Sequence, residues 1–332
     1  MWRRNLLIKK IDFPENSFFL ITGGAGFIGS NLAEAIINTG NRVRILDNFS
    51  SGKKENIKEY IGNEKVEIIG GDIRDYDTCM DACKGIDFVL HHAALASVEA
   101  SIKDPQMANE INVNGMLNML ISANKNNVKR FIYASSSAVY GDNNSKQKSE
   151  EEKGVLLSPY AVTKKANEYY AQNFNALFGL RTIGLRYFNI FGPKQDPESE
   201  YSAVIPKFIN KFLSGNIPVV DGDGMQTRDF VYIENVINAN MIACTSGINA
   251  CGQNYNIGCG KGITIKELFT IICDLLGIKA EPIFGKAREG DIRHSISDIK
   301  KARKFLSYTP QVDIYEGLKR TIDWYKNNQS KE

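Results

Sequence analysis

Residues Phe18 to Ile37, FFLITGGAGFIGSNLAEAII, decide the fold, because a short apolar run meets a glycine-rich loop that opens a helical pattern. In this loop Gly23, Gly26 and Gly29 form a G-x-x-G-x-x-G spacing. Because glycine has no side chain, the backbone N–H groups at the start of the helix can approach a pyrophosphate closely. The stretch therefore predicts a strand, a phosphate-binding loop and a helix in succession.

Strands and helices continue to alternate along the first half of the chain. Apolar runs predict strands at 41–47, 66–73, 87–92, 131–134 and 181–187, with helical segments between them. This alternation predicts an α/β fold with a doubly wound parallel (Rossmann) sheet. We assign residues 1–187, together with about 229–250, to a dinucleotide-binding domain. Residues 188–228 and 251–332 then form a smaller C-terminal substrate region, which we expect to be interwoven with the sheet.

The composition is that of a soluble globular protein. The 332 residues are 43% hydrophobic and 24% charged, and 41 basic against 38 acidic residues give a net charge of +3. Because the two signs are interspersed, we expect no nucleic-acid or membrane partner. The apolar run near Leu6 is too short for a signal-peptide core, and no stretch is long enough to span a bilayer. These features favour a cytoplasmic location.

Asp47 ends the second predicted strand, where a carboxylate can bind both hydroxyls of an adenosine ribose. Its charge would repel a 2′-phosphate, so the sequence favours NAD over NADP. The alternative is that Asp47 caps a helix or turns the chain ahead of Asn48. Asp72, followed by Ile73, is a candidate for a second carboxylate beside the adenine amino group.

Tyr160 and Lys164 carry the candidate chemistry. Their spacing of four puts the phenol and the ammonium on one helix face, where the cation can favour the phenolate. An unperturbed tyrosine titrates near ~10, so ionising it at neutral pH needs a pKa drop of about three units. Ser136 follows an apolar run whose strand would end at the same edge of the sheet. Alone, the Tyr–Lys spacing is also that of an ordinary amphipathic helix.

The histidines and cysteines predict no metal site. His91 and His92 precede Ala93 and Ala94, whose small side chains would admit the backbone of a cofactor. No carboxylate-rich ligand spacing accompanies the three histidines, so we expect packed or hydrogen-bonded imidazoles. The six cysteines are scattered, and we expect them to be free thiols.

From Phe18 to Tyr325 the chain resembles the extended short-chain dehydrogenase/reductases, and among them the nucleotide-sugar 4-epimerases. The matching blocks are TGGAGFIG (22–29), HAA (92–94), SSSAVYG (135–141), SPYAVTK (158–164), LRYFN (185–189), TRDFV (227–231) and REGD (288–291). The resemblance implies a tightly held NAD that is regenerated in every cycle. It also implies a homodimer formed by helices around 109–126 and 160–177.

The resemblance assigns roles to single residues. Tyr160 would take the proton from the 4-hydroxyl of the sugar, Ser136 would bind the same oxygen, and Lys164 would bind the nicotinamide ribose and lower the tyrosine pKa. The residues expected at the cofactor are Gly23, Gly26, Phe27, Ile28, Gly29, Asp47, Asn48, Asp72, Ile73, Ala93, Ala94, Tyr160 and Lys164. Those expected at the substrate are Ser97, Ser136, Ser137, Asn189, Gln195, Arg228, Arg288 and Ser295.

Firm binding of a UDP group is expected from Arg228 and Arg288, because a guanidinium fork suits phosphate oxygens; the resemblance places Asn189 at the diphosphate as well. Without the resemblance, either arginine is an ordinary surface residue. Related 4,6-dehydratases carry an acid in the triplet where this chain has Ser136, Ser137 and an alanine, which argues against dehydration.

Ser295 stands where epimerases restricted to UDP-glucose and UDP-galactose carry a bulky tyrosine. A serine there resembles the branch that acts on N-acetylated sugars, and GPKQDP (192–197) strengthens the likeness to bacterial UDP-N-acetylglucosamine 4-epimerases. The sequence thus predicts epimerisation at C4 of UDP-N-acetylglucosamine through a 4-keto sugar, with UDP-glucose as a further substrate. The alternatives are that Ser295 is only a small loop residue, and that the chain is a UDP-uronic acid 4-epimerase, a UDP-glucuronate decarboxylase or a non-catalytic NAD sensor.

Overall fold

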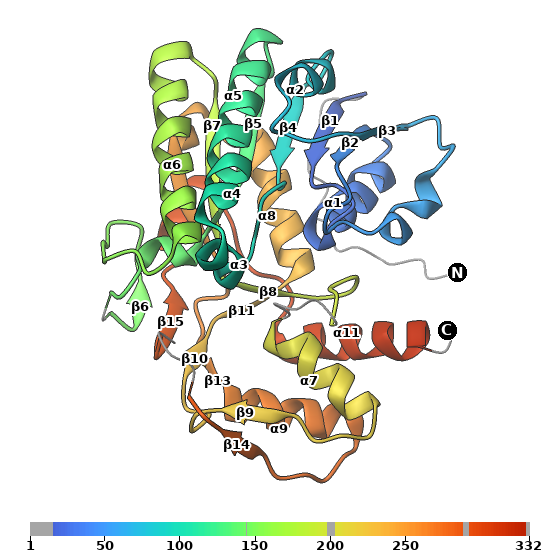
Figure 1. The fold of residues 1–332 in the computed structure, drawn as a ribbon, viewed down its shortest axis with the longest axis vertical. Helices are drawn as coiled ribbons and strands as arrows, with labels where there is room; N and C mark the ends of the chain where they lie inside the picture. The colour runs from blue at the N-terminus through green and yellow to red at the C-terminus, as the bar shows by residue number, and fades with distance from the viewer. Residues whose placement is uncertain (1–15, 144, 198–202, 288–291, 330–332) are drawn as a thin grey trace.

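The computed structural model describes residues 16–143, 145–197, 203–287 and 292–329. Its centre is a seven-stranded sheet in the order β12-β7-β5-β4-β1-β2-β3, and every neighbouring pair is parallel (Figure 1). The strands are β1 (Phe18–Thr22), β2 (Arg42–Asp47), β3 (Val66–Gly70), β4 (Phe88–His91), β5 (Arg130–Ser136), β7 (Thr182–Tyr187) and β12 (Gln253–Ile257). The predicted doubly wound α/β fold is confirmed.

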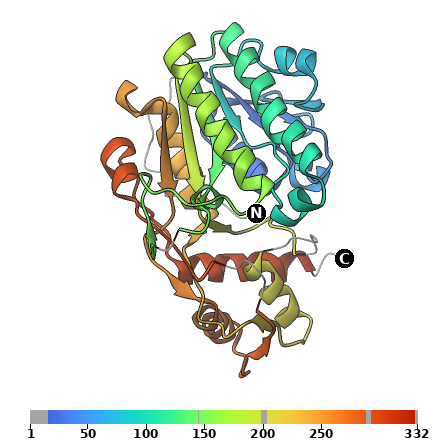
Figure 2. The ribbon, with the colours of Figure 1, turned by 60° about the vertical axis from the view of Figure 1, so that its left-hand side comes forward.

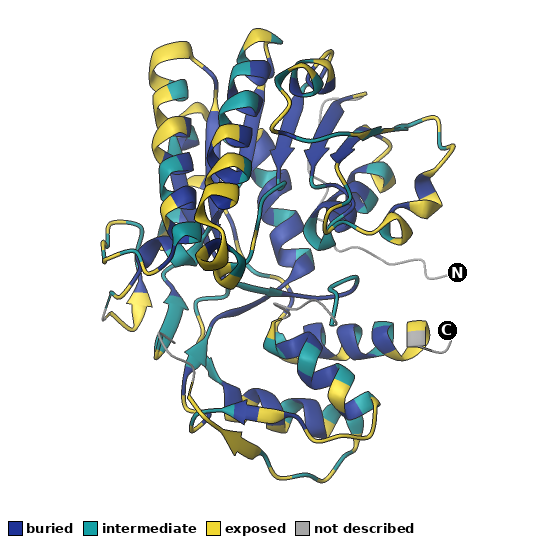
Figure 3. Ribbon diagram, viewed as in Figure 1, coloured by how far each residue is buried: buried dark blue, intermediate teal, exposed yellow. Residues whose placement is uncertain are grey.

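Helices cover both faces of this sheet (Figure 2). On one face lie α2 (Tyr76–Ala82), α5 (Gly115–Lys125) and α6 (Pro159–Phe178), and on the other lie α1 (Phe27–Asn38) and α8 (Ile233–Thr245). Each face has its own cluster of buried apolar side chains, and the outward sides of α5 and α6 are exposed (Figure 3). The sheet is therefore buried on both faces, as parallel sheets are.

The order of the strands reverses between β1 and β4. The chain runs outward through β2 and β3, returns to β4 on the other side of β1, and continues through β5 and β7. At such a reversal the connections at the carboxyl ends diverge and leave a crevice, where ligands bind in open α/β sheets. The glycine loop after β1 and the end of β4 border this point.

A smaller region lies beyond the carboxyl ends of these strands (Figure 1). Its four-stranded sheet has the order β13-β10-β15-β6, and two further pairs are β11 with β8 and β14 with β9. The strands are β6 (Gln147–Lys148), β8 (Asn189–Phe191), β9 (Val219–Asp221), β10 (Thr227–Arg228), β11 (Phe230–Tyr232), β13 (Ile263–Thr264), β14 (Ile283–Gly285) and β15 (His294–Ser297). Its main helices are α7 (Val204–Leu213), α9 (Ile265–Leu276) and α11 (Ile314–Gln329).

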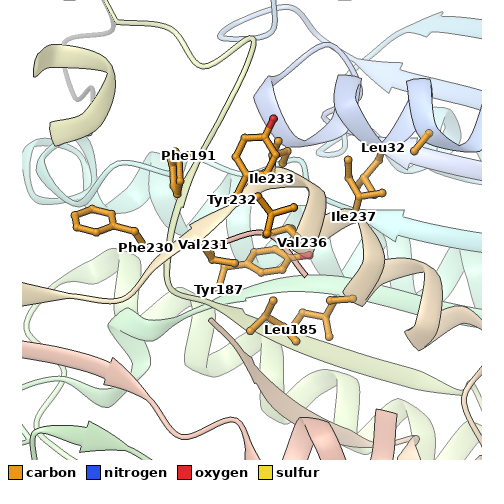
Figure 4. Close-up of a cluster of buried hydrophobic side chains, with 14 of the residues drawn as sticks. Leu32, Leu185, Tyr187, Phe191, Phe230, Val231, Tyr232, Ile233, Val236 and Ile237 are labelled. Carbon is orange, nitrogen blue, oxygen red and sulfur yellow. The ribbon is translucent and has the colours of Figure 1, made fainter. Parts of the chain in front are cut away.

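The two regions exchange segments. Strand β6 comes from the first half of the chain but pairs with β15, and β12 comes from residues assigned to the substrate region but pairs with β7. The division of the chain at 187, 228 and 250 stays a prediction. The apolar side chains of β11 and α8 pack against β7 and α1 and join the regions into one core (Figure 4).

Short elements complete the described chain. They are the helices α3 (Val98–Lys103), α4 (Pro105–Asn109) and α10 (Lys300–Leu306), a π-helical turn at Glu110–Asn114, and 3₁₀ turns at Lys54–Asn56, Lys58–Tyr60, Ser137–Tyr140 and Ile248–Ala250. The prediction that the third strand reaches residue 73 is wrong. Strand β3 ends at Gly70, because the Asp72 carboxylate accepts a hydrogen bond from the backbone N–H of Arg74 and turns the chain.

Candidate active site

The glycine loop is packed so closely that side chains are excluded from it. Gly23 has a φ of +66°, and a Cβ there would lie 2.8 Å from the backbone nitrogen of Ala93. A Cβ on Gly29 would lie 2.2 Å from the carbonyl oxygen of Gly23. Gly26 precedes α1, whose first residues Phe27 and Ile28 are half-buried. The loop is therefore a backbone cradle at a helix N-terminus, which fits the diphosphate of a dinucleotide.

Asp47 at the end of β2 is buried beneath this loop. One carboxylate oxygen accepts a hydrogen bond from the backbone N–H of Ala25 and the other from that of Phe49, each at 2.8 Å. Both the loop and a turn are thus held by Asp47, which agrees with the alternative that it shapes a turn. A carboxylate has further lone pairs. Its binding of the adenosine ribose stays a prediction.

Asn48 and Asp72 meet at the ends of β2 and β3. The amide of Asn48 donates to Asp72 at 2.8 Å, and hydrogen bonds from Arg74 hold the pKa of Asp72 at about 2. The carboxylate is therefore charged at neutral pH. Ile73, the residue after Asp72, is buried against Gly115 of α5, so the polar side chains of Asn48 and Asp72 lie next to the apolar core.

The two histidines at the end of β4 are packed and hydrogen-bonded, as predicted. His91 Nδ1 lies 2.8 Å from the hydroxyl of Thr22, and His92 Nε2 lies 3.0 Å from the hydroxyl of Tyr187. Burial lowers the pKa of His91 to about 3 and that of His92 to about 4, so both are neutral. Among the described residues no cluster of histidine, cysteine and carboxylate side chains could hold a metal ion. All six cysteines are free, as expected.

The predicted catalytic residues converge where β5 meets the start of α6. Helix α6 begins after Ser158, whose hydroxyl accepts from the backbone N–H of Ala161. Near this end Ser136, which closes β5, lies close enough to the hydroxyl of Tyr160 to favour the ionised phenol and so to lower its pKa. Lys164 is buried, and its ammonium donates to the carbonyl oxygen of Ala134 at 2.8 Å.

The proton affinities of this pair follow from burial. The Lys164 ammonium lies 5.8 Å from the ring centroid of Tyr160, and burial lowers its pKa to about 8. Burial raises the pKa of Tyr160, and the hydrogen bond from Ser136 only partly offsets this effect. The residues of the chain do not by themselves supply the expected drop in the tyrosine pKa, because burial of the phenol outweighs the one hydrogen bond that favours its ionised form.

The substrate side gathers three predicted residues. Arg228 of β10 pairs in register with Ser295 of β15, and its guanidinium donates to the carbonyl oxygens of Thr227 and Ile292 at 2.8 and 2.6 Å. Asn189 of β8 pairs with β11, and its N–H donates at 3.0 Å to the carbonyl of residue 229, which directly follows Arg228. Arg288 lies outside the described residues.

Ser97, Ser137 and Gln195 are placed differently. Ser97 caps α3, and Ser137 opens the 3₁₀ turn that follows Ser136. The amide of Gln195 donates to the carbonyl of Ile190 at 3.3 Å, and its neighbour Asp196 binds Lys53 at 2.8 Å. Gln195 is thus bonded to the strand that carries Asn189, and its neighbour Asp196 reaches the segment after β2. Their roles at a substrate stay predictions.

Two buried carboxylates had no assigned role in the sequence interpretation. Asp229 accepts hydrogen bonds from the N–H groups of Cys259 and Gly260 at 2.8 and 2.9 Å and from Ser297, so it ties β15 to the loop after β12. Glu168 on α6 pairs with Arg186 of β7 at 2.7 Å. The sequence contained a signal for the pair of Glu168 and Arg186. Glu168 follows Lys164 by four residues, so it lies on the same helix face.

Comparison with known proteins places this site in a family. Residues 19–258 match the NAD dependent epimerase/dehydratase family. A putative UDP-glucose 4-epimerase of Methanocaldococcus jannaschii is 40% identical over 311 residues, which are 93% of this chain and 98% of that protein.

Two solved structures share the whole fold. A UDP-N-acetylglucosamine 4-epimerase from Methanobrevibacter ruminantium M1, in complex with UDP-N-acetylmuramic acid, superposes with a TM-score of 0.90 at 40% identity and covers 95% of this chain and 100% of that one. A mutant UDP-glucuronic acid 4-epimerase from Bacillus cereus, in complex with UDP-4-deoxy-4-fluoro-glucuronic acid and NAD, gives 0.86 at 31% identity, with 94% and 99% covered.

The chain belongs to the NAD-dependent epimerase/dehydratase family, the extended short-chain dehydrogenase/reductases. Within this family it is an isomerase of the UDP-sugar 4-epimerase type, and its cofactor is NAD. The predicted resemblance and the predicted cofactor are thereby confirmed. No helix in the described part of the chain is long and apolar enough to cross a membrane.

Proposed function

We propose that the enzyme interconverts UDP-N-acetylglucosamine and UDP-N-acetylgalactosamine, and that it also accepts UDP-glucose and UDP-galactose. The observation that carries this choice is the register of Ser295 with Arg228. If Arg228 holds the diphosphate, the half-buried hydroxymethyl of Ser295 stands one strand away, where a larger side chain would compete with a 2-acetamido group. The smaller residue leaves that volume to the sugar.

In the proposed mechanism Tyr160 removes the proton from the 4-hydroxyl of the sugar. Ser136, which lies beside the phenol, holds the same oxygen, and the Lys164 ammonium, 5.8 Å from the centroid of the tyrosine ring, favours the ionised phenol together with the positive charge that a bound nicotinamide would supply. NAD supplies reversible hydride acceptance at C4. The protein then returns the proton to the 4-keto sugar after the sugar has turned about its diphosphate linkage.

In this proposal the sheet region binds NAD and the smaller region binds the UDP group. The glycine loop and Asp47 fit the diphosphate and the adenosine ribose of NAD, while Arg228 and Asn189 serve the UDP group. In this proposal Ser136 and Tyr160 act only on the 4-oxygen of the sugar and hold neither its C2 nor its C6 substituent. The sugar ring is therefore free to turn while its nucleotide stays bound.

We also propose a cytoplasmic homodimer that has no nucleic-acid or membrane partner. Exposed apolar side chains on the outward side of α6 support the dimer, among them Val162, Tyr169, Leu177 and Phe178. A water-exposed helix face with this composition is typical of a contact surface. Sedimentation equilibrium of the purified protein would test it, and a monomer at micromolar concentration would contradict it.

A UDP-uronic acid 4-epimerase is the second candidate. His294 precedes Ser295, and burial together with the positive charges of Lys146, Arg293 and Arg228 lowers the pKa of its imidazole. Such an accumulation of cations favours a sugar that carries a carboxylate. The same cations also suit the diphosphate, which the first proposal already requires.

The deciding experiment is proton NMR of the purified enzyme with UDP-N-acetylglucosamine, UDP-glucose or UDP-glucuronic acid, with the anomeric signals followed over time. Formation of the galacto epimer from the N-acetylated sugar supports the proposal. Conversion of UDP-glucose alone would refute the preferred substrate but keep the mechanism. Conversion of the glucuronic acid alone, or its loss of carbon dioxide, would establish the alternatives, and no turnover of any would overturn the proposed function.

A further inference from the structure

The last three residues of β5 each contact α6. The carbonyl of Ala134 accepts from Lys164 at 2.8 Å, and Ser136 lies close enough to the hydroxyl of Tyr160 to lower the pKa of the phenol. Between them, the hydroxyl of Ser135 donates to Glu168 at 2.7 Å. Two of these contacts involve the proposed catalytic side chains. The third, from Ser135, has no part in the proposed chemistry.

Glu168 is a fully satisfied buried carboxylate. It is 1% exposed, and its oxygens accept hydrogen bonds from Arg186 Nε at 2.7 Å and Arg186 Nη2 at 2.8 Å, in addition to Ser135 and Lys165. Arg186 is 4% exposed. Two charges fixed by a bidentate bond in the interior have one preferred arrangement, because any displacement leaves a buried charge unpaired.

The network extends to the neighbouring strand of the sheet. Arg186 Nη1 donates to the hydroxyl of Tyr140 at 3.0 Å, and that hydroxyl donates to the side-chain oxygen of Asn256 at 2.6 Å. Asn256 belongs to β12. Glu168 thus connects α6 to three strands, β5, β7 and β12, at the end of the sheet where the proposed chemistry takes place.

We propose that Glu168, held by Arg186, is a positioning residue that acts through Ser135 to fix the end of β5 and thereby the position of the Ser136 hydroxyl beside Tyr160. The inference rests on the proposed roles of those two residues. Ser135 is adjacent to Ser136, so a shift of its backbone moves the next hydroxyl. The Ser136 oxygen also accepts from the N–H of Ala138 at 3.1 Å, which leaves its single proton free to donate to the phenolate.

The proposal predicts a change in proton affinity and not only in stability. A hydrogen bond to the ionised phenol lowers its pKa, so loosening the Ser136 contact raises the pKa of Tyr160. A pair that served the fold alone would change the free energy of unfolding and leave this pKa where it is. The two roles can therefore be separated by titrating one phenol.

The test uses the NAD-loaded enzyme and the variant Ser135→Ala, which removes the link to β5 while leaving the Glu168–Arg186 pair intact. The matched control is Thr182→Val. The buried hydroxyl of Thr182 donates to the carbonyl of Ala171 at 2.8 Å, so it also joins a strand to α6, but at the other end of the sheet. Ultraviolet difference titration against Tyr160→Phe in each background reports the pKa of Tyr160, and kcat, KM and the pH profile of kcat are measured alongside.

We expect Ser135→Ala to raise the Tyr160 pKa by about one unit and to lower kcat by about tenfold with KM unchanged. Ser135→Thr keeps a hydroxyl, so most of the wild-type pKa of Tyr160 and most of the wild-type kcat should remain. Ser135→Cys should shift this pKa less than Ser135→Ala does. Thr182→Val should change neither the pKa of Tyr160 nor kcat. An unchanged pKa in both Ser135→Ala and Ser135→Cys, or an equal shift in Thr182→Val, would overturn the proposal. The titration needs no sugar, so it tests the positioning role separately from the proposed function. If the pKa of Tyr160 shifted as expected but the protein converted no UDP-sugar, the proposed function would be refuted and the positioning role of Glu168 would stand.

Discussion

The site has two halves that are built in opposite ways. Where β5 meets α6, Ser135, Lys164, Glu168 and Arg186 are each no more than 4% exposed. Glu168 accepts hydrogen bonds from Ser135 and Arg186, and Lys164 donates to the carbonyl of Ala134. In the four-stranded sheet on the substrate side, β10, β13 and β6 are only two residues long, and Arg228 and Ser295 are half-buried. This contrast indicates that the proposed proton-transfer groups are held rigidly, whereas the side chains proposed to select the sugar can be exchanged at little cost to the fold.

The largest effect is expected in the buried half from Tyr160→Phe. The variant keeps the ring and its packing but removes the proposed base, so kcat should fall by about 10²–10⁴-fold. Steady-state epimerisation assays with NAD content and circular dichroism measured on the same samples would check this result. The fold and the bound NAD should be retained.

Tyr169→Phe is the matched control for this change. Tyr169 lies on the same helix, but its side chain is 57% exposed. Its loss of the hydroxyl should leave kcat within about twofold of the wild type. A fully active Tyr160→Phe enzyme would remove the proposed base and with it the contrast between the two halves.

The next effect concerns stability and pH, again in the buried half. Burial raises the pKa of Glu168, but the hydrogen bonds and charge of Arg186 outweigh burial and lower it overall. Because the folded pKa is depressed, the stabilisation is present above the unfolded pKa of about 4.3 and is lost as the pH falls through the folded pKa. Glu168→Gln leaves Arg186 buried without its charge partner, which should cost about 3 kcal/mol in the free energy of unfolding at pH 7.

Urea unfolding at pH 7 and near pH 3 measures that cost at both ends of the titration. The difference in the free energy of unfolding between wild type and Glu168→Gln should be smaller at the lower pH. An equal difference at both pH values would show that the pair contributes packing but that its charges are not linked to stability. Asp72→Asn breaks the more exposed pair with Arg74, whose salt bridge measures 2.8 Å. Solvent screening there limits the expected change to about 1 kcal/mol or less.

A smaller effect is expected on the substrate side from Arg228→Lys. The ammonium keeps the charge but loses the planar fork, so KM for the UDP-sugar should rise about tenfold while kcat changes little. Arg293→Lys is the control, because Arg293 lies near the same sheet but pairs with the exposed Asp223 at 2.8 Å. A fall in kcat without a change in KM would place Arg228 in the chemistry instead.

The sequence predicted the nucleotide-binding half more completely than the substrate half, for a physical reason. Long apolar strands and a glycine loop leave a local pattern, so β1, the loop and α1 were predicted from adjacent residues. The pairing of β10 with β15 joins Arg228 to Ser295, which are 67 residues apart, and no periodicity of such short strands predicts it. Only the resemblance to a family placed those two residues together.

Buried polar networks were the other part that sequence patterns did not reveal. Arg186 and Glu168 interrupt a strand and a helix with charges that, taken separately, look like surface residues. Their bidentate bond depends on the packing of α6 against β7, which is tertiary information. The burial of the Tyr160 phenol is tertiary information of the same kind, since the spacing to Lys164 was visible in the sequence but the burial was not.

A last effect, no larger than that of Arg228→Lys, is expected from Ser295→Tyr, and it tests the exchangeable half most directly. The phenol would fill the volume assigned to the 2-acetamido group, so kcat/KM should fall more for UDP-N-acetylglucosamine than for UDP-glucose, with a change of about tenfold in their ratio. Competition assays with both sugars in one tube measure this ratio without dependence on enzyme concentration. Equal losses on the two sugars would mean that residue 295 contributes to the fold of β15 and not to the choice of sugar, and the substrate region would then be less exchangeable than its short strands indicate.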